Sequence, residues 1–232
     1  MTNPLQLKYF VRRAASACLL VTLACGGKQS SQNPSPQTTA PLPTAGIAGQ
    51  RVALTPLTLV GAEDTLHLDA LIADRRATLD RSDSVIGALL TARAPEVTWV
   101  GPAELRRIAR RAPGIAADPD QMGTSFLRAT SILDIPDPLR YQLRTLMGLV
   151  GGRYVLVPAG LVFRPVRPLP GHGAEPPPAS SSAHPPVLAE LEVVMVDSRM
   201  GKVGWRTTAR GEGPDAWAAL ARAVKNLTPG LP

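Results

Sequence analysis

The chain has 232 residues, a formal net charge of +7 and two cysteines. Two cysteines exclude a disulfide-rich scaffold, so the fold must rest on packing of its apolar residues, which make up 44% of the chain. The mild basic excess gives no case for nucleic-acid binding, although it suits attraction to anionic headgroups or to an acidic envelope polymer.

The first 24 residues are typical of an export signal. A basic region with Lys8, Arg12 and Arg13 precedes an apolar run from Ala14 to Leu23. This run has about ten residues and a membrane-spanning helix needs roughly twenty, so it predicts a cleaved signal peptide at residues 1–24. Cleavage removes three of the 25 basic residues and none of the 18 acids, which lowers the net charge from +7 to +4.

The processing of Cys25 determines the N-terminus of the exported chain. Small Ala24 before it resembles the lipobox of bacterial lipoproteins, in which the thiol is acylated and becomes the new N-terminus. The box is imperfect, since Thr22 stands where leucine is usual, and Thr22 with Ala24 also suits an ordinary signal peptidase. Because Cys18 lies inside the signal, ordinary cleavage would leave one unpaired thiol in an oxidising compartment. We therefore predict lipidation of Cys25.

The residues after Cys25 predict a tether. Gly26 replaces the aspartate that typically retains lipoproteins at the inner membrane, which favours the periplasmic face of the outer membrane if the organism has two membranes. Residues 25–49, the lipidated cysteine and linker, are rich in Gly, Ser, Pro and Gln and nearly uncharged. This composition predicts a flexible linker with a root-mean-square reach of roughly 25–30 Å.

Residues 50–228 predict a single α/β domain. Its apolar patterns indicate strands at 51–60, 96–101 and 153–163, a hairpin at 188–213, and helices at 82–93, 102–112, 139–150 and 214–227.

Proline and glycine mark the element ends. Asp118-Pro119 and Asp137-Pro138 each predict an aspartate N-cap followed by Pro at the first helical position, and Gly151-Gly152 ends the helix that the second pair starts. Residues 164–186 hold too many prolines and serines to pair within a sheet. They predict a mobile loop between neighbouring strands.

The hairpin VVMVDSRMGKVGW carries a family resemblance. It resembles the hairpin of CsgG-like envelope lipoproteins, in which a valine-rich strand ends in Asp, a turn with Gly follows, and the next strand carries Trp. GGRYVLVPAGLV is similar to that family's preceding strand, and RVALTPL to its opening strand. The resemblance extends to the LpoB-like activators of peptidoglycan synthases and to the N-terminal domain of TolB-type proteins. It implies an α+β fold with a single mixed sheet of about five strands and helices packed on it.

The family also includes subunits of curli-type secretion channels. Their pore-forming hairpins need about 9–11 alternating residues on each arm. The inserted segments of this chain are helical or Pro-rich instead, and no such pair stands outside the predicted core sheet. Pore formation is therefore not expected.

Titratable side chains form no recognisable catalytic or metal-binding motif. His67 precedes the first helix, and His172 and His184 lie in the Pro-rich loop with only Glu175 to join them, so we interpret all three histidines as solvated. The sequence has no G-x-S-x-G motif and no phosphate-binding glycine loop. Three aspartates spaced five residues apart are interpreted as surface acids: Asp64, Asp69 and Asp74.

Four arginines lie close together on the predicted 102–112 helix: Arg106, Arg107, Arg110 and Arg111. The i,i+4 pairs 106/110 and 107/111 repel each other unless acids or an anionic partner compensate them. A solvated helix face is the simpler interpretation. The functional alternative is docking onto headgroups, glycan-linked carboxylates or an acidic protein. In the hairpin, Asp197, Gly201 and Trp205 are interpreted as turn cap, left-handed turn residue and packing for the last helix.

These observations predict a membrane-anchored envelope lipoprotein that acts as a non-catalytic binding, scaffolding or regulatory module in the periplasm. The expected partners are the membrane, through the N-terminal lipid, and an envelope protein; association with further copies of the chain stays open. No cofactor, metal or nucleic acid is expected. Two alternatives remain: a hydrolase of envelope polymers that uses scattered Asp and His, and a subunit of a curli-type secretion assembly.

Overall fold

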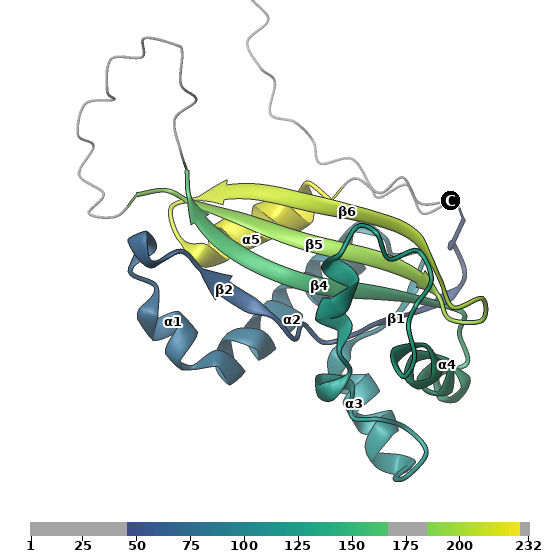
Figure 1. Ribbon diagram of the computed structural model, residues 1–232. Helices are drawn as coiled ribbons and strands as arrows, with labels where there is room; N and C mark the ends of the chain where they lie inside the picture. The colour runs from purple at the N-terminus through teal and green to yellow at the C-terminus, as the bar shows by residue number, and fades with distance from the viewer. Residues whose placement is uncertain (1–45, 167–184, 228–232) are drawn as a thin grey trace, which may run out of the picture. The chain divides into compact units, whose positions relative to one another are not determined.

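The computed structural model describes residues 46–166 and 185–227. The predicted signal peptide, Cys25, most of the tether and most of the Pro-rich loop, with His172 and His184, lie outside these described residues. Within them, a six-stranded mixed sheet has the order β3-β1-β4-β5-β6, with β2 paired to β4 (Figure 1). The predicted α+β fold with one mixed sheet is thereby confirmed.

The strands are β1 (Arg51–Leu54), β2 (Val60–Ala62), β3 (Thr98–Val100), β4 (Tyr154–Pro165), β5 (Val187–Asp197) and β6 (Lys202–Gly213). The α-helices are α1 (Asp69–Ala73), α2 (Arg75–Arg93), α3 (Pro102–Arg111), α4 (Leu139–Val150) and α5 (Ala216–Lys225). Short 3-10 helices are η1 (Asp64–Leu66), η2 (Pro119–Gln121) and η3 (Thr124–Arg128). Strand β1 pairs in parallel with β3 and with β4, and β2 also pairs in parallel with β4, whereas β5 is antiparallel to both β4 and β6. In the described ranges, no helix combines the length and apolarity needed to cross a bilayer.

The prediction of one strand over 51–60 is wrong, because β1 and β2 are separate. The backbone N–H of Thr55 still donates to the carbonyl of Leu156 (3.1 Å), and Pro56, which follows, has no N–H to offer a neighbouring strand. The next N–H, of Leu57, turns to the carboxylate of Asp83 (2.8 Å). Pairing with β4 resumes only at β2.

Helix ends agree with the sequence in part. Asp118 caps η2 as predicted, and Gly151 ends α4 in a left-handed conformation (φ 75°). The prediction for Asp137 is wrong, because Pro138 itself takes the N-cap position of α4 and Asp137 pairs instead with Arg140 (2.9 Å). The last helix begins at Ala216, two residues later than predicted.

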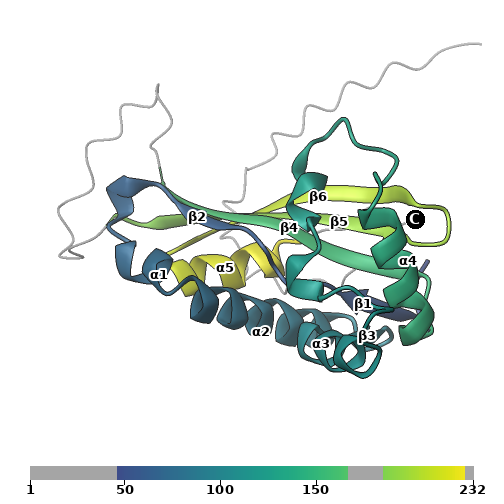
Figure 2. The same cartoon turned by 60° about the horizontal axis from the view of Figure 1, so that its bottom comes forward.

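The side chains of alternate residues in the central strands pack into two cores on opposite faces of the sheet. Leu156 of β4 joins the core that α2 and α5 cover, whereas its neighbours Val155 and Val157 join the core under α3, α4 and η3. Figure 2 shows the sheet nearly edge-on, with α1, α2 and α5 below it. The predicted apolar stripe of α4 is buried and consists of Leu139, Leu143, Leu146, Met147 and Val150.

Candidate functional site

A cluster of charged side chains lies beyond the carboxyl ends of β1 and β3, where α2, α3 and η2 meet. Strand β3 leads through Gly101 into α3, and the chain leaving β1 passes Leu57, which contacts the cluster. Binding crevices of open α/β sheets are found at the carboxyl ends of parallel strands. This position makes the cluster the first candidate for a functional site.

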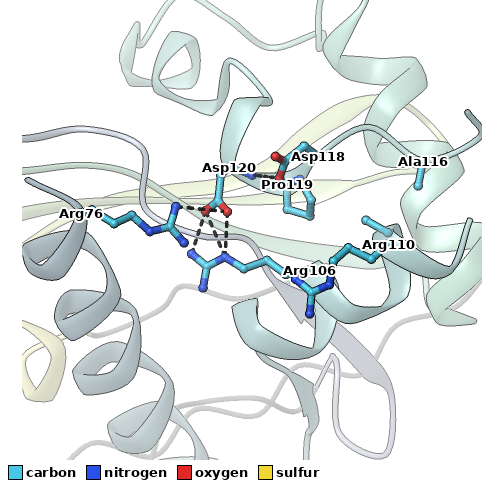
Figure 3. A pocket seen from close by; sticks show the side chains of 8 residues that line it. Arg76, Arg106, Arg110, Ala116, Asp118, Pro119 and Asp120 are labelled. Carbon is cyan, nitrogen blue, oxygen red and sulfur yellow. Dashed lines mark hydrogen bonds and ion pairs between the residues drawn. The ribbon is translucent and has the colours of Figure 1, made fainter. Parts of the chain in front are cut away.

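Arg106 of α3 is the centre of the cluster, and its side chain is only 15% exposed. Its Nε and Nη2 atoms form a fork on Asp120 of η2 (2.9 and 2.7 Å), and Nη2 also contacts Asp83 (2.9 Å) and Asp80 (3.3 Å) of α2. Arg76 of α2 reaches Asp80 (3.0 Å) and Asp120 (3.4 Å). Figure 3 shows the two guanidinium groups converging on Asp120. The cluster, Arg76 with Asp80, Asp83, Arg106 and Asp120, therefore joins three elements through internal ion pairs.

The environment shifts the titration of these groups in different directions. Asp83 is 6% exposed, and burial raises its pKa to about 6, although the Leu57 N–H and Arg106 favour its charged form. Burial also acts on Asp120, yet Arg106 and Arg76 hold the pKa of Asp120 below its ordinary value. The hydrogen bond to Asp120 is the main cause that raises the pKa of Arg106 above its ordinary value. Asp83 is thus the carboxylate of the cluster whose charged form burial disfavours enough to raise its pKa.

Two pockets flank Arg106. The smaller, of about 280 Å³, lies between α3 and η2 (Figure 3) and is lined by Arg76, Arg106, Ala109, Arg110, Ala116, Asp118, Pro119 and Asp120. The larger, of about 460 Å³, lies at the start of α3 and is lined by Arg76, Asp80, Asp83, Ser84, Gly101, Pro102, Ala103, Glu104 and Arg106. The charged side chains of the cluster that line both pockets already pair with one another, whereas Arg110 at the rim of the smaller pocket has no carboxylate partner among the described residues.

The structure separates the four predicted arginines. Arg106 is compensated by aspartates of the chain itself, which is one of the two conditions that the i,i+4 spacing required. Arg107 is exposed and pairs with Glu104. Arg110 is exposed at the rim of the smaller pocket, and Arg111 is exposed without a carboxylate partner among the described residues. Three of the four arginines therefore remain on the outer surface.

Sequence reasoning missed the aspartates of this cluster. The sequence pattern does mark Asp83. It lies on the same helical stripe as Ile86 and Leu90 (i, i+3 and i+7), both of which are buried, and this spacing predicts that Asp83 is buried with them. No comparable pattern marks Asp120, because η2 is a single turn that begins at a proline. Its position depends on how the segment after α3 folds back.

The other predicted residues have local roles. His67 is exposed in a left-handed conformation, Asp74 caps α2 at the N–H of Ala77 (3.1 Å), and Asp64 and Asp69 are exposed. Across residues 46–166 and 185–227, no three His, Cys, Asp or Glu side chains gather in a way that could hold a metal ion.

Asp197 and Gly201 act as interpreted, as turn cap and left-handed turn residue. Asp197 Oδ1 accepts hydrogen bonds from the N–H groups of Arg199 and Met200 (3.0 and 3.1 Å), and Gly201 is left-handed (φ 70°). Trp205 packs against the core to which α5 belongs. Partial burial of Asp197 acts against its charge, but hydrogen bonds from Arg153 and the turn keep its pKa below the ordinary value.

Comparison with known proteins gives structural matches only. No protein-family model and no curated protein matches the chain. Similar solved structures include the LpoB C-terminal domain from Salmonella enterica (TM-score 0.36, 13% identity, covering 70% of this chain and 82% of that chain). Lipoprotein GNA1162 from Neisseria meningitidis has a TM-score of 0.32 at 13% identity, and the match covers 70% of this chain and 82% of that chain. The hypothetical protein CT253 from Chlamydia trachomatis has a TM-score of 0.37 at 12% identity, and the match covers 71% of this chain and 73% of that chain. The LpoB-like domains named from the hairpin are thus among the similar structures. Likeness this loose does not define a function, which must come from the chain's own residues.

Proposed function

We propose that the chain is an exported lipoprotein, anchored through an acyl group on Cys25, that serves the cell envelope as a non-catalytic binding or regulatory module. Support for the anchor comes from the sequence, in which an apolar run ends at Ala24-Cys25 and an uncharged tether follows. Gly26 favours the periplasmic face of an outer membrane as the location.

The observation that carries the binding function is the division of arginines on α3. Internal aspartates satisfy Arg106, whereas Arg107, Arg110 and Arg111 stay on the outer surface. Four residues after the end of α3, Ile115 is 64% exposed. A cationic surface with an apolar side chain at its edge suits a partner that presents carboxylates around an apolar contact. We name Arg107, Arg110, Arg111 and Ile115 the α3 surface and propose an acidic envelope protein as its partner.

The geometry around Asp83 supports binding over catalysis. A carboxylate with a raised pKa beside a pocket is the usual candidate for a general acid or base. Here each oxygen of Asp83 already accepts a hydrogen bond, one from the Leu57 N–H and one from Arg106. Among the described residues, no histidine or hydroxyl side chain forms a hydrogen bond to it. We infer that the cluster fixes the orientation of α3 and thereby presents the α3 surface.

Site-specific photocrosslinking in intact cells tests this proposal. A photoreactive amino acid at position 111 should capture one partner, and the same amino acid at exposed Thr91 of α2 should not. The double charge reversal Arg107→Glu and Arg111→Glu should abolish the crosslink from position 115 while the melting temperature stays unchanged, because exposed substitutions cost under about 0.5 kcal/mol. Equal capture from positions 91 and 111 would contradict a dedicated surface.

Two further measurements separate the parts of the proposal. Radiolabelled palmitate should label the wild type and not Cys25→Ser, and an unlabelled wild type would remove the anchor. Turnover of a cell-wall polymer by the purified chain, lost in Asp83→Asn, would overturn the non-catalytic assignment.

A further inference from the structure

One end of the sheet brings together segments that are far apart in the sequence. Val52 of β1 pairs with Tyr154 of β4, and Tyr154 pairs with Asp197 of β5. The start of β1, the start of β4 and the β5–β6 turn therefore lie at the same end, as Figure 1 and Figure 2 both show. The last turn of α4 lies there too, since Arg51 Nη1 donates to the carbonyl of Val150 (2.9 Å).

The β5–β6 turn presents an apolar side chain between basic ones. Met200, the third residue of the turn, is 61% exposed, and Arg199 and Lys202 on either side of it are also exposed. The acid of the turn, Asp197, points its carboxylate at the turn N–H groups and at Arg153, so it does not offset the charge at the tip. A long apolar side chain flanked by bases is typical of a loop that meets a lipid headgroup layer.

Helix α4 extends this surface. Arg144 Nη2 donates to the carbonyl of Arg199 (2.8 Å), which fixes the helix beside the turn. Tyr141, one helical turn before Arg144, is 68% exposed. We name Arg51, Tyr141, Arg144, Arg199, Met200 and Lys202 the basic tip.

The charge balance at this end is positive. Three pairs cancel: Arg140 with Asp137 (2.9 Å), Arg153 with Asp197, and Lys202 with Asp134 (3.9 Å). Three further arginines, Arg51, Arg144 and Arg199, have no carboxylate partner among the described residues. One more exposed acid, Glu96, lies nearby, because its carbonyl accepts the N–H of Gly49 just before β1 (2.8 Å). An excess of basic charge therefore remains at the tip.

The chain reaches the domain at this same end. Residues 26–45 connect Cys25 to Gly46, and residues 46–49 lead directly into β1. Twenty residues span at most about 70 Å, so an acyl group on Cys25 keeps this end of the domain within about 70 Å of the bilayer. Each basic residue near an anionic membrane surface contributes attraction that salt screens.

We propose that the basic tip docks on anionic lipid headgroups, with Met200 and Tyr141 entering the interfacial layer. This proposal takes the Cys25 anchor from the proposed function, but it concerns a different surface from the α3 surface. The docked state holds the domain against the bilayer in one orientation.

A fluorescent label at position 200 of the acylated, full-length mature protein tests the proposal. In Met200→Cys the introduced thiol is the only free one, because Cys18 leaves with the signal and Cys25 is acylated. The matched control is Ile115→Cys, since Ile115 and Met200 are similarly exposed (64% and 61%). Each protein is labelled with an environment-sensitive dye and reconstituted into vesicles of phosphatidylcholine alone or with 30% phosphatidylglycerol (about one anionic lipid in three, a dense headgroup charge).

The expected result is a blue shift of the dye at position 200 with phosphatidylglycerol, quenching by brominated lipid, and loss of both at high salt. The dye at position 115 should report water throughout. Arg144→Glu with Arg199→Glu should abolish the shift at position 200, whereas Arg107→Glu with Arg111→Glu should leave it intact.

Three outcomes overturn the proposal. A dye at position 200 that reports water in anionic vesicles excludes docking, even when the protein floats with the vesicles and the anchor is therefore intact. A shift that is equal in neutral vesicles excludes recognition of anionic headgroups. A shift that depends on protein density and not on lipid charge assigns the tip to contact between copies of the chain. Failure to float with either vesicle marks failure of the Cys25 anchor instead.

Discussion

The two faces of the sheet are closed by different means. On one face, α5 packs so closely on β6 that the glycines of the strand are required: a Cβ at Gly211 would lie 2.1 Å from the backbone N of Ala223. On the other face, the segment between α3 and α4 has little regular structure, and side chains hold it. Arg206 donates to the carbonyls of Ala129 and Ile132, and Arg106 joins η2 to α2 and α3. The first face is closed by backbone contact, whereas on the second face charged side chains add to the apolar core and hold the segment between α3 and α4.

This difference predicts different sensitivities. A face closed by backbone contact tolerates no added atom, because neither backbone can move without loss of its hydrogen bonds. A face closed by ion pairs tolerates changes of shape at its rim, but it depends on the protonation of the groups inside it. Three experiments separate the two cases, in order of expected effect.

Gly211→Val is expected to cause the largest loss. Its side chain would meet the backbone of α5 at Ala223 and at the carbonyl of Ala219 (2.5 Å), so the helix must leave the sheet. We expect the free energy of unfolding to fall by more than about 4 kcal/mol. Urea unfolding followed by circular dichroism measures it. The matched control is Gly204→Val on the same strand, where a Cβ would lie 3.8 Å from the carbonyl of Met195, and a loss there as large would show that β6 itself rejects valine.

Arg106→Ala is expected to have the next largest effect. It leaves Asp83 buried with only the Leu57 N–H as partner, and removing one member of a buried ion pair costs about 3 kcal/mol at pH 7. The loss should be smaller at pH 5, where Asp83 can take up a proton. Arg107→Ala on the outer side of the same helix should change the free energy of unfolding by less than about 0.5 kcal/mol. Similar losses for the two variants would mean that burial does not distinguish the two arginines.

The sequence predicted the apolar packing on both faces better than the contacts that close them. Periodicity marked α2 and the hairpin on the first face and α4 on the second, since one buried face imposes a regular apolar pattern. The Gly211 contact was not foreseen, because the need for glycine there depends on where α5 crosses β6. The ion cluster also escaped prediction: Asp80 and Asp120 are 40 residues apart in sequence, and only the fold brings them to the same guanidinium group. The four arginines of α3 look alike in sequence, and only the packing of η2 singles out Arg106.

Asp83→Asn is expected to have the smallest effect, a change in how the free energy of unfolding of the protein depends on pH. The folded protein raises the pKa of Asp83 from 3.8 to about 6, so between these values the folded state holds a proton that the unfolded state has lost. Stability from this group is therefore fully present below about pH 4 and is lost as the pH rises to about 6, by roughly 2–3 kcal/mol. Asp120, whose pKa is lowered, contributes the opposite slope, but only below its ordinary value.

The measurement is urea unfolding of the wild type and of Asp83→Asn between about pH 4.5 and pH 6.5, the window in which Asp83 titrates and Asp120 does not. Asparagine keeps an oxygen for the Leu57 N–H and cannot ionise, so the wild-type curve should fall with pH relative to the variant. Asp74→Asn, an exposed helix cap, should leave the slope unchanged, because no buried charge is involved. Parallel curves for the wild type and Asp83→Asn would mean that Arg106 keeps Asp83 ionised across the window. The charge-closed face would then be as insensitive to pH as the face that backbone contact closes.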